Sequence, residues 1–342
     1  MKKSLIALAA LAFVGAASAQ SSVTLFGIVD VGVSHYSVSG GQSLNTMSAN
    51  GYNSDRIGVR GTEDLGGGMS ASFWLEGAMS PQDGTKSGLS FTRRSTVSLA
   101  GNWGELRLGR DYTPSFWNLT IFDPFGTNGV GTNIAMAAKA AMKDPTFVRS
   151  NNAVGYFLPP NLGGFYGQVQ YAFSGTPANS TGEYKGLRVG YQAGPANVAL
   201  SWGNTSAQTK SAATPEINAL NIGGSWDFGV AQLLAQYDDS KYDNGVTTPH
   251  LKTYLIGGLV PVGAGQIRID YSTVKMTSTG GAEPESSQWA LGYVHNLSKR
   301  TALYATYAHL SNKNGASLSY GGLTGIANAG GNGYDIGIRH SF

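Results

Sequence analysis

Side chains that perform catalysis or bind metals are few in this chain, and none are spaced for either task. There is no cysteine, which excludes thiolate nucleophiles, thiolate metal sites and disulfides. The five histidines show no HExxH or other metal-ligand spacing, and they are His35, His250, His295, His309 and His340. No GxSxG or P-loop motif occurs. The sequence therefore predicts no enzyme, no metal site and no cofactor.

Arginine is the ionisable residue whose spacing carries information. Arg56 and Arg60 alternate with Ile57 and Val59, so on a strand the two arginines share a face opposite the apolar side chains. The same reading places three further residues on polar strand faces, namely Glu76, Arg94 and Arg149. Arginine keeps its charge among other cations, and rings of charged side chains can select ions in an aqueous passage. This pattern suits ion selection better than a reaction.

The elements that carry these residues are strands with a two-residue period. In the segment 266–272, Ile267, Ile269 and Tyr271 alternate with polar side chains. Sixteen candidate strands follow from this reading: 22–36, 54–63, 69–79, 91–101, 104–113, 149–158, 164–174, 183–193, 196–204, 216–228, 231–240, 251–260, 265–275, 286–297, 301–311 and 333–342. Only the segment 133–142, NIAMAAKAAM, is expected to form a short helix.

The connections between these strands alternate between short and long. Tight turns such as EDLGGG and NLSKR alternate with longer segments such as 37–53, 80–90 and 114–148. An up-and-down meander whose two ends face different compartments gives this alternation. A soluble sandwich would need two apolar faces packed together, and a single sheet rarely contains sixteen strands. The predicted fold class is all-β, a transmembrane antiparallel up-and-down β-barrel of 16 strands.

The first residues of the chain have the features of a secretory signal peptide. Lys2 and Lys3 precede an apolar stretch over 5–14, and Ala-Ser-Ala at 17–19 provides a cleavage pattern. We therefore expect residues 1–19 to be the signal peptide and 20–342 to be a single barrel domain. The net charge of +3 falls to +1 once the two lysines are removed, so no strong field is available to attract nucleic acid.

The last residues, GYDIGIRHSF, form a strand that ends on an aromatic side chain. In lipid, every backbone N–H and C=O needs a partner inside the protein, so a terminal strand cannot remain an open edge. We expect this strand to pair with the first one, at 22–36, and to close the barrel.

The longest connection, 114–148, is a candidate for narrowing the channel. Sixteen strands enclose an aqueous space unless something fills it, and structureless loops of this length are usually functional or disordered. Phe116, Trp117, Phe122 and Phe125 give this segment the means to pack against the wall.

The order of the motifs resembles the general diffusion porins of the Gram-negative outer membrane, and most closely the β-proteobacterial trimeric type. The resemblance covers essentially the whole mature chain. It is carried by the leader, SSVTLFGIVDVGVSHY, SDRIGVRGTEDLGGGMSASFWLE, FTRRSTVSL, GELRLGR, LSKRT and the terminal aromatic. It implies a 16-stranded homotrimeric barrel for passive diffusion of small hydrophilic solutes and ions. The implied partners are outer-membrane lipid, lipopolysaccharide and the barrel-assembly machinery, which would read Phe342 as an assembly signal.

The resemblance also assigns the pore-lining residues. It implies that 114–148 folds inward and that Asp123 is one of its carboxylates. Arg56, Arg94 and Arg149 are expected to face acidic groups at the narrowest point, with Glu76 as one such acid. The candidate set on the wall is completed by Arg60, which has lumen parity but no fixed height.

Several functions remain compatible with the sequence. A general porin that prefers anions and a porin selective for anionic nutrients, such as phosphate or organic acids, would use the same arginines. A barrel enzyme would need a Ser/His or Asp/His constellation at the rim and tends to have fewer strands. The strand count and the long inward loop argue against this third possibility.

Overall fold

A computed structural model of the chain describes residues 22–85, 90–175, 180–206, 216–243, 246–277, 281 and 283–342. The predicted signal peptide, residues 1–19, lies outside these ranges, so its assignment stays a prediction. Neither of the two helices in the described part of the chain is long and apolar enough to cross a membrane.

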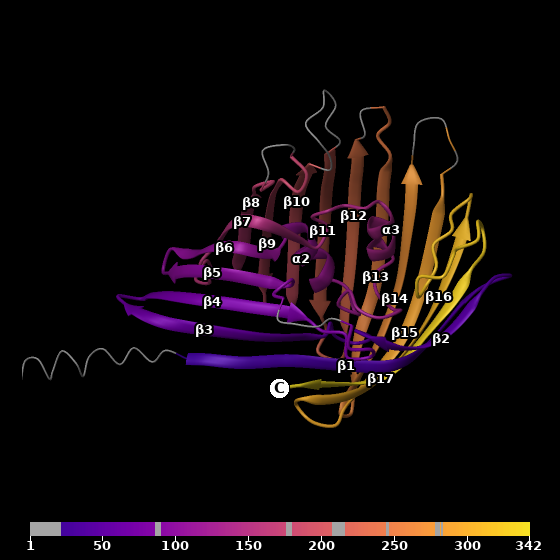
Figure 1. The fold of residues 1–342 in the computed structure, drawn as a ribbon, viewed down its shortest axis with the longest axis horizontal. Coiled ribbons are helices and arrows are strands. Elements are labelled where there is room, and N and C mark those ends of the chain that lie inside the picture. The colour runs from indigo at the N-terminus through magenta and orange to yellow at the C-terminus, as the bar shows by residue number, and fades with distance from the viewer. Residues whose placement is uncertain are drawn as a thin grey trace, which may run out of the picture.

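Within the described residues, seventeen strand segments form one antiparallel sheet that closes on itself (Figure 1). Their bounds are β1 Ser22–Val38, β2 Ser43–Ala49, β3 Arg56–Gly66, β4 Met69–Ala78, β5 Arg94–Gly101, β6 Gly104–Tyr112, β7 Arg149–Phe157, β8 Phe165–Ala172, β9 Tyr184–Ala193, β10 Ala196–Ser206, β11 Glu216–Asp227, β12 Gln232–Asp243, β13 His250–Val262, β14 Gly265–Thr277, β15 Glu285–Asn296, β16 Thr301–Lys313 and β17 Gly331–Ser341. Both β2 and β3 pair with β1, at 31–37 and 22–28 respectively. They are two parts of one stave, so the predicted closed 16-stranded barrel is confirmed.

The second stave differs from its prediction because the chain returns along β1 earlier than expected. The sequence predicted a loop over 37–53, but the chain turns at 39–42 and β2 pairs with β1 at once. Few apolar residues alternate in SLNTMSA, so the period-two signal is weak there. Only residues 50–55 leave the wall.

The barrel closes through the terminal strand, as expected. Register runs from Ile28 opposite Ser341 to Val38 opposite Gly331, and the C-terminus lies beside β1 (Figure 1). Beyond β17, the Phe342 N–H donates to the Gly27 carbonyl and the Gly27 N–H donates back to the Phe342 carbonyl, both at 3.1 Å.

The two faces of the wall differ as a membrane barrel requires. On β17, Ile336 and Ile338 point outward with 65% and 47% of their surface exposed, whereas Asp335 on the same strand and Asp30 on β1 point inward and are buried. Apolar side chains face outward and polar ones inward, which is the reverse of a soluble protein.

Two short helices lie inside the barrel in the connection between β6 and β7 (Figure 1). The helix α3, Ala135–Ala141, falls within the predicted 133–142 segment. The helix α2, Pro114–Ile121, was not predicted, although its start carries a signal. The Thr113 side chain accepts a hydrogen bond from the Phe116 N–H at 3.4 Å, and Pro114 occupies the first turn.

Candidate functional site

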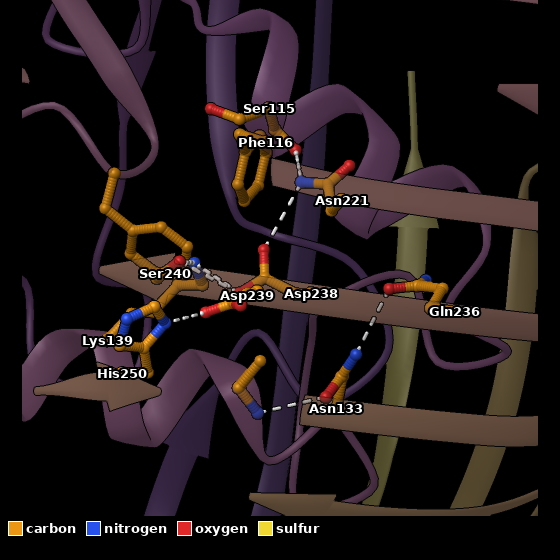
Figure 2. Close-up of polar contacts among 12 residues, drawn as sticks. Ser115, Phe116, Asn133, Lys139, Asn221, Gln236, Asp238, Asp239, Ser240 and His250 are labelled. Atoms are coloured by element: carbon orange, nitrogen blue, oxygen red, sulfur yellow. Dashed lines mark hydrogen bonds and ion pairs between the residues drawn. The ribbon is translucent and has the colours of Figure 1, made fainter. Parts of the chain in front are cut away.

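The segment 114–148, called the constriction loop from here on, folds into the barrel as predicted, and α2 docks on the wall at β9 to β11. The Asn118 amide donates to the Ala199 carbonyl at 2.9 Å and its oxygen accepts from Arg188 Nε at 2.7 Å. The Asn221 amide donates to the Ser115 carbonyl at 3.2 Å (Figure 2). Lumen-facing polar side chains of the wall therefore serve as anchors for the loop.

A buried ion pair fixes α3. Lys139 Nζ lies 2.8 Å from Asp238 Oδ1 on β12, and the two side chains are 3% and 1% exposed. Lys139 also donates to Ser240, as Figure 2 shows. Nearby, the Asn133 amide donates to Gln236 Oε1 at 3.2 Å. Because both charges are removed from water, the pair ties α3 to one position on the wall.

The middle of the constriction loop is attached to β15 and β17, near the pairing of β17 with β1 that closes the barrel. The Val130 N–H donates to Asp335 Oδ2 on β17 at 2.8 Å. The Gln288 amide on β15 donates to the Thr132 carbonyl at 2.8 Å. The loop is thus held at points from β9 to β17, while its two ends join β6 and β7. None of the anchors named above lies on the wall formed by β3 to β7.

An arginine cluster occupies that wall, at the barrel end that carries the long connections. It consists of Arg56 at the start of β3, Arg93 just before β5 and Arg149 at the start of β7, gathered around Glu76 and Tyr112. Glu76 Oε1 lies 2.5 Å from Arg93 Nε and 3.6 Å from Arg56 Nη1. The Tyr112 hydroxyl accepts from Arg93 Nη2 at 2.6 Å and from Arg149 Nη2 at 2.8 Å.

Aromatic rings and hydrogen bonds hold these guanidinium groups in fixed orientations. The Arg149 guanidinium lies 4.3 Å from the centroid of the Tyr112 ring. Trp74 Nε1 donates to Glu76 Oε2 at 3.0 Å, so both oxygens of this carboxylate are engaged by neighbours. Two guanidinium groups contact the one carboxylate and the third binds the Tyr112 hydroxyl, which leaves an excess of positive charge at the wall.

Arg94 and Arg60 both contact the Trp74 ring and are not among the arginines that pair with Glu76. The Arg94 guanidinium is 4.6 Å from the Trp74 ring and that of Arg60 is 5.0 Å from it. Arg94 Nε donates to Thr96 Oγ1 at 3.0 Å and lies 3.9 Å from Asp111. Of the predicted wall residues, the structure brings Arg56, Arg149 and Glu76 together and supplies Arg93 where Arg94 was expected.

Arg93 was missed because the strand starts later than the sequence reading placed it. The candidate strand began at residue 91, whereas β5 begins at Arg94. Alternation assigned Arg94 to the inner face, but parity cannot be extended into a loop, so it gave Arg93 no position. The two consecutive arginines in FTRRS were the sequence feature that could have pointed to Arg93 as a second candidate.

Asp123 lies in the interior of the constriction loop. It is 4% exposed and accepts hydrogen bonds from the backbone N–H groups of Phe125, Thr127 and Asn133 at 2.8, 3.0 and 3.0 Å. Burial raises the pKa of the Asp123 carboxyl above its ordinary value. These contacts close the loop on itself and leave almost no surface of Asp123 to face a solute.

The part of the chain that the structure describes brings together no three His, Cys, Asp or Glu side chains that could hold a metal ion.

Comparison with known proteins agrees with this architecture. A family model described as Gram-negative porin matches residues 5–315. The chain is 42% identical to outer membrane porin protein 32 of Delftia acidovorans and 32% identical to an outer membrane porin protein of Bordetella pertussis, with all chains covered in full. The solved anion-selective porin from Comamonas acidovorans has a TM-score of 0.85 and 38% identity, covering 94% of this chain and 100% of that one. The chain belongs to the Gram-negative porin family and is a β-barrel of the outer membrane.

Proposed function

We propose that this porin is a water-filled channel for passive diffusion of small hydrophilic solutes and ions, and that it prefers anions. The observation that carries the preference is the arginine cluster beside the constriction loop, in which two guanidinium groups share the Glu76 carboxylate and a third, that of Arg149, binds the Tyr112 hydroxyl. A ring with this charge excess attracts anions and repels cations as they pass. The similar porin from Comamonas acidovorans is described as anion-selective, which supports the same preference here.

Arg149 contributes most directly to the uncompensated charge. Within the described residues, no carboxylate lies within ion-pair distance of Arg149, and its hydrogen-bonding partner is the neutral Tyr112 hydroxyl. Arg107, by contrast, is neutralised by Glu105 at 2.9 Å and Asp111 at 2.6 Å. The charge of Arg149 is therefore uncompensated by a neighbouring carboxylate, whereas that of Arg107 is compensated.

The constriction set that we propose differs from the sequence-based one by adding Arg93 and leaving out Asp123. Four of its members form the arginine cluster, namely Arg56, Arg93, Arg149 and Glu76. The other two, Arg94 and Arg60, lie beside them at Trp74. Asp123 acts in folding the loop, because its oxygens bind backbone N–H groups of that loop.

Assembly in the outer membrane completes the proposal. We expect a homotrimer in contact with lipid and lipopolysaccharide, inserted by the barrel-assembly machinery through recognition of Phe342. In support of the last point, the Phe342 side chain is 41% exposed at the end of the closing strand. Porins form trimers in the resembling family, and the apolar outward faces of the staves provide surface for such contacts.

Bilayer recordings of the purified protein test the function and separate its two variants. Under a KCl gradient, the sign of the reversal potential should show that Cl⁻ is more permeant than K⁺. The conductance should rise linearly with salt concentration. Conductance that saturates with phosphate or an organic acid would favour the porin selective for anionic nutrients. A folded barrel that does not conduct would refute both.

A further inference from the structure

We infer that residues 50–55, the inward excursion between β2 and β3, are a second constriction element that positions Arg56 and secures the tip of the constriction loop. This inference rests on the proposed function, because it concerns how an arginine of the proposed pore is held. The excursion interrupts a stave of the wall, which costs backbone hydrogen bonds that an unbroken strand would keep. Its contacts inside the lumen replace them.

The base of the excursion is bound to β1 through a buried aspartate. Asp30, 0% exposed, accepts hydrogen bonds at Oδ2 from the Tyr52 and Asn53 backbone N–H groups at 2.8 and 2.5 Å. The backbone N–H of Asp30 donates to Asp55 Oδ1 at 2.6 Å. The other carboxylate oxygen of Asp30, Oδ1, accepts from the Tyr304 hydroxyl at 2.6 Å. Side chains thus supply the partners that a neighbouring strand would otherwise give.

The far side of the excursion meets the tip of the constriction loop. Ser54 Oγ donates to Asn128 Oδ1 at 2.7 Å. Next to this bond the backbones are in close contact, because a Cβ at Gly129 would lie 2.3 Å from the Gly51 carbonyl oxygen. Gly129 also has φ of +66°, a conformation that favours glycine. The following residue, Val130, is the one fixed by the wall, so this tip is held from two sides.

Ser54 connects this contact to the arginine cluster. While its hydroxyl binds Asn128, its carbonyl oxygen accepts from Arg56 Nε at 2.8 Å. Arg56 Nη1 then reaches to 3.6 Å from Glu76. Displacement of the loop tip would therefore move Ser54 and, through it, the guanidinium group of Arg56.

Tyr52 extends the contacts of the excursion to side chains of β14 and β17. Its ring lies 4.4 Å from the Arg268 guanidinium on β14 and 5.1 Å from that of Arg339 on β17. Cation–π contacts of this kind hold an aromatic ring in place. The excursion is thereby supported at both ends, as a constriction element must be if it is to keep its shape against flow.

The experiment uses the absence of cysteine from the natural chain. In the double variant Ser54→Cys/Asn128→Cys, oxidation should give an intramolecular cross-link, seen as a reducible change in gel mobility. The oxidised channel should keep the wild-type reversal potential and low open-channel noise. The reduced channel, like Ser54→Ala and Asn128→Ala, should show higher noise and an anion-to-cation permeability ratio lower by about twofold. Ser43→Ala, on the exposed part of the same stave, is the matched control.

Two results would overturn the inference while the proposed function stands. One is a conducting, anion-preferring barrel in which the two cysteines never cross-link. The other is an unchanged permeability ratio and noise in both alanine variants. A wild-type channel without anion preference would instead refute the proposed function.

Discussion

Replacing Lys139 with methionine should release α3 from the barrel wall. The Lys139–Asp238 pair is 2.8 Å long and almost wholly buried, so the substitution leaves the Asp238 carboxylate without a cation in a site that water does not reach. Removing one partner of a buried pair typically costs about 3–5 kcal/mol. The staves are held by continuous backbone ladders, so we expect the docked loop, rather than the barrel, to bear this cost.

The expected signs are higher open-channel noise, altered conductance and protease cleavage within 114–148, in a barrel that stays folded. Lys139→Met/Asp238→Leu is the matched control. Exchanging a buried pair for apolar residues is often neutral or stabilising, so the double variant should return towards wild type. Wild-type noise and protease resistance in Lys139→Met would refute the idea that this pair fixes the loop, as would a double variant no better than the single one.

Two further outcomes follow from the structure. Gly223→Ala should increase noise and alter single-channel conductance, because its Cβ would lie 2.2 Å from the Phe122 ring, whereas Gly224→Ala, with 3.5 Å to its nearest neighbour, should match wild type. Phe342→Ala should reduce the amount of barrel in the outer membrane of cells while thermal unfolding of refolded protein changes little; equal amounts in cells would contradict its role as an assembly signal.

The barrel was predictable because each stave separates lipid from water, which imposes a two-residue period on the sequence. That signal fails where a strand carries too few apolar side chains for its two faces to differ. β2 has few apolar residues, so its seven residues were read as loop. The helix α2 was overlooked although Thr113 and Pro114 mark its start, since aromatic residues in a long connection do not alternate or repeat clearly.

The constriction itself was only partly predictable. Parity placed Arg56, Arg94, Arg149 and Glu76 on the inner face, but it could not be extended to Arg93, which lies in the loop just before β5. The anchors of the loop join residues far apart in the sequence. Asn118 and Ala199, for example, are 81 positions apart, and no local pattern specifies such a partner.

The reversal potential of Arg149→Ser under a KCl gradient tests the central claim most directly. Arg149 has no carboxylate partner among the described residues, so its removal takes away positive charge without freeing an acid. Arg300→Ser, in the turn between β15 and β16, removes the same charge away from the cluster. We expect anion preference to fall in Arg149→Ser and to be retained in Arg300→Ser. An unchanged reversal potential in Arg149→Ser, in a folded and conducting channel, would contradict it.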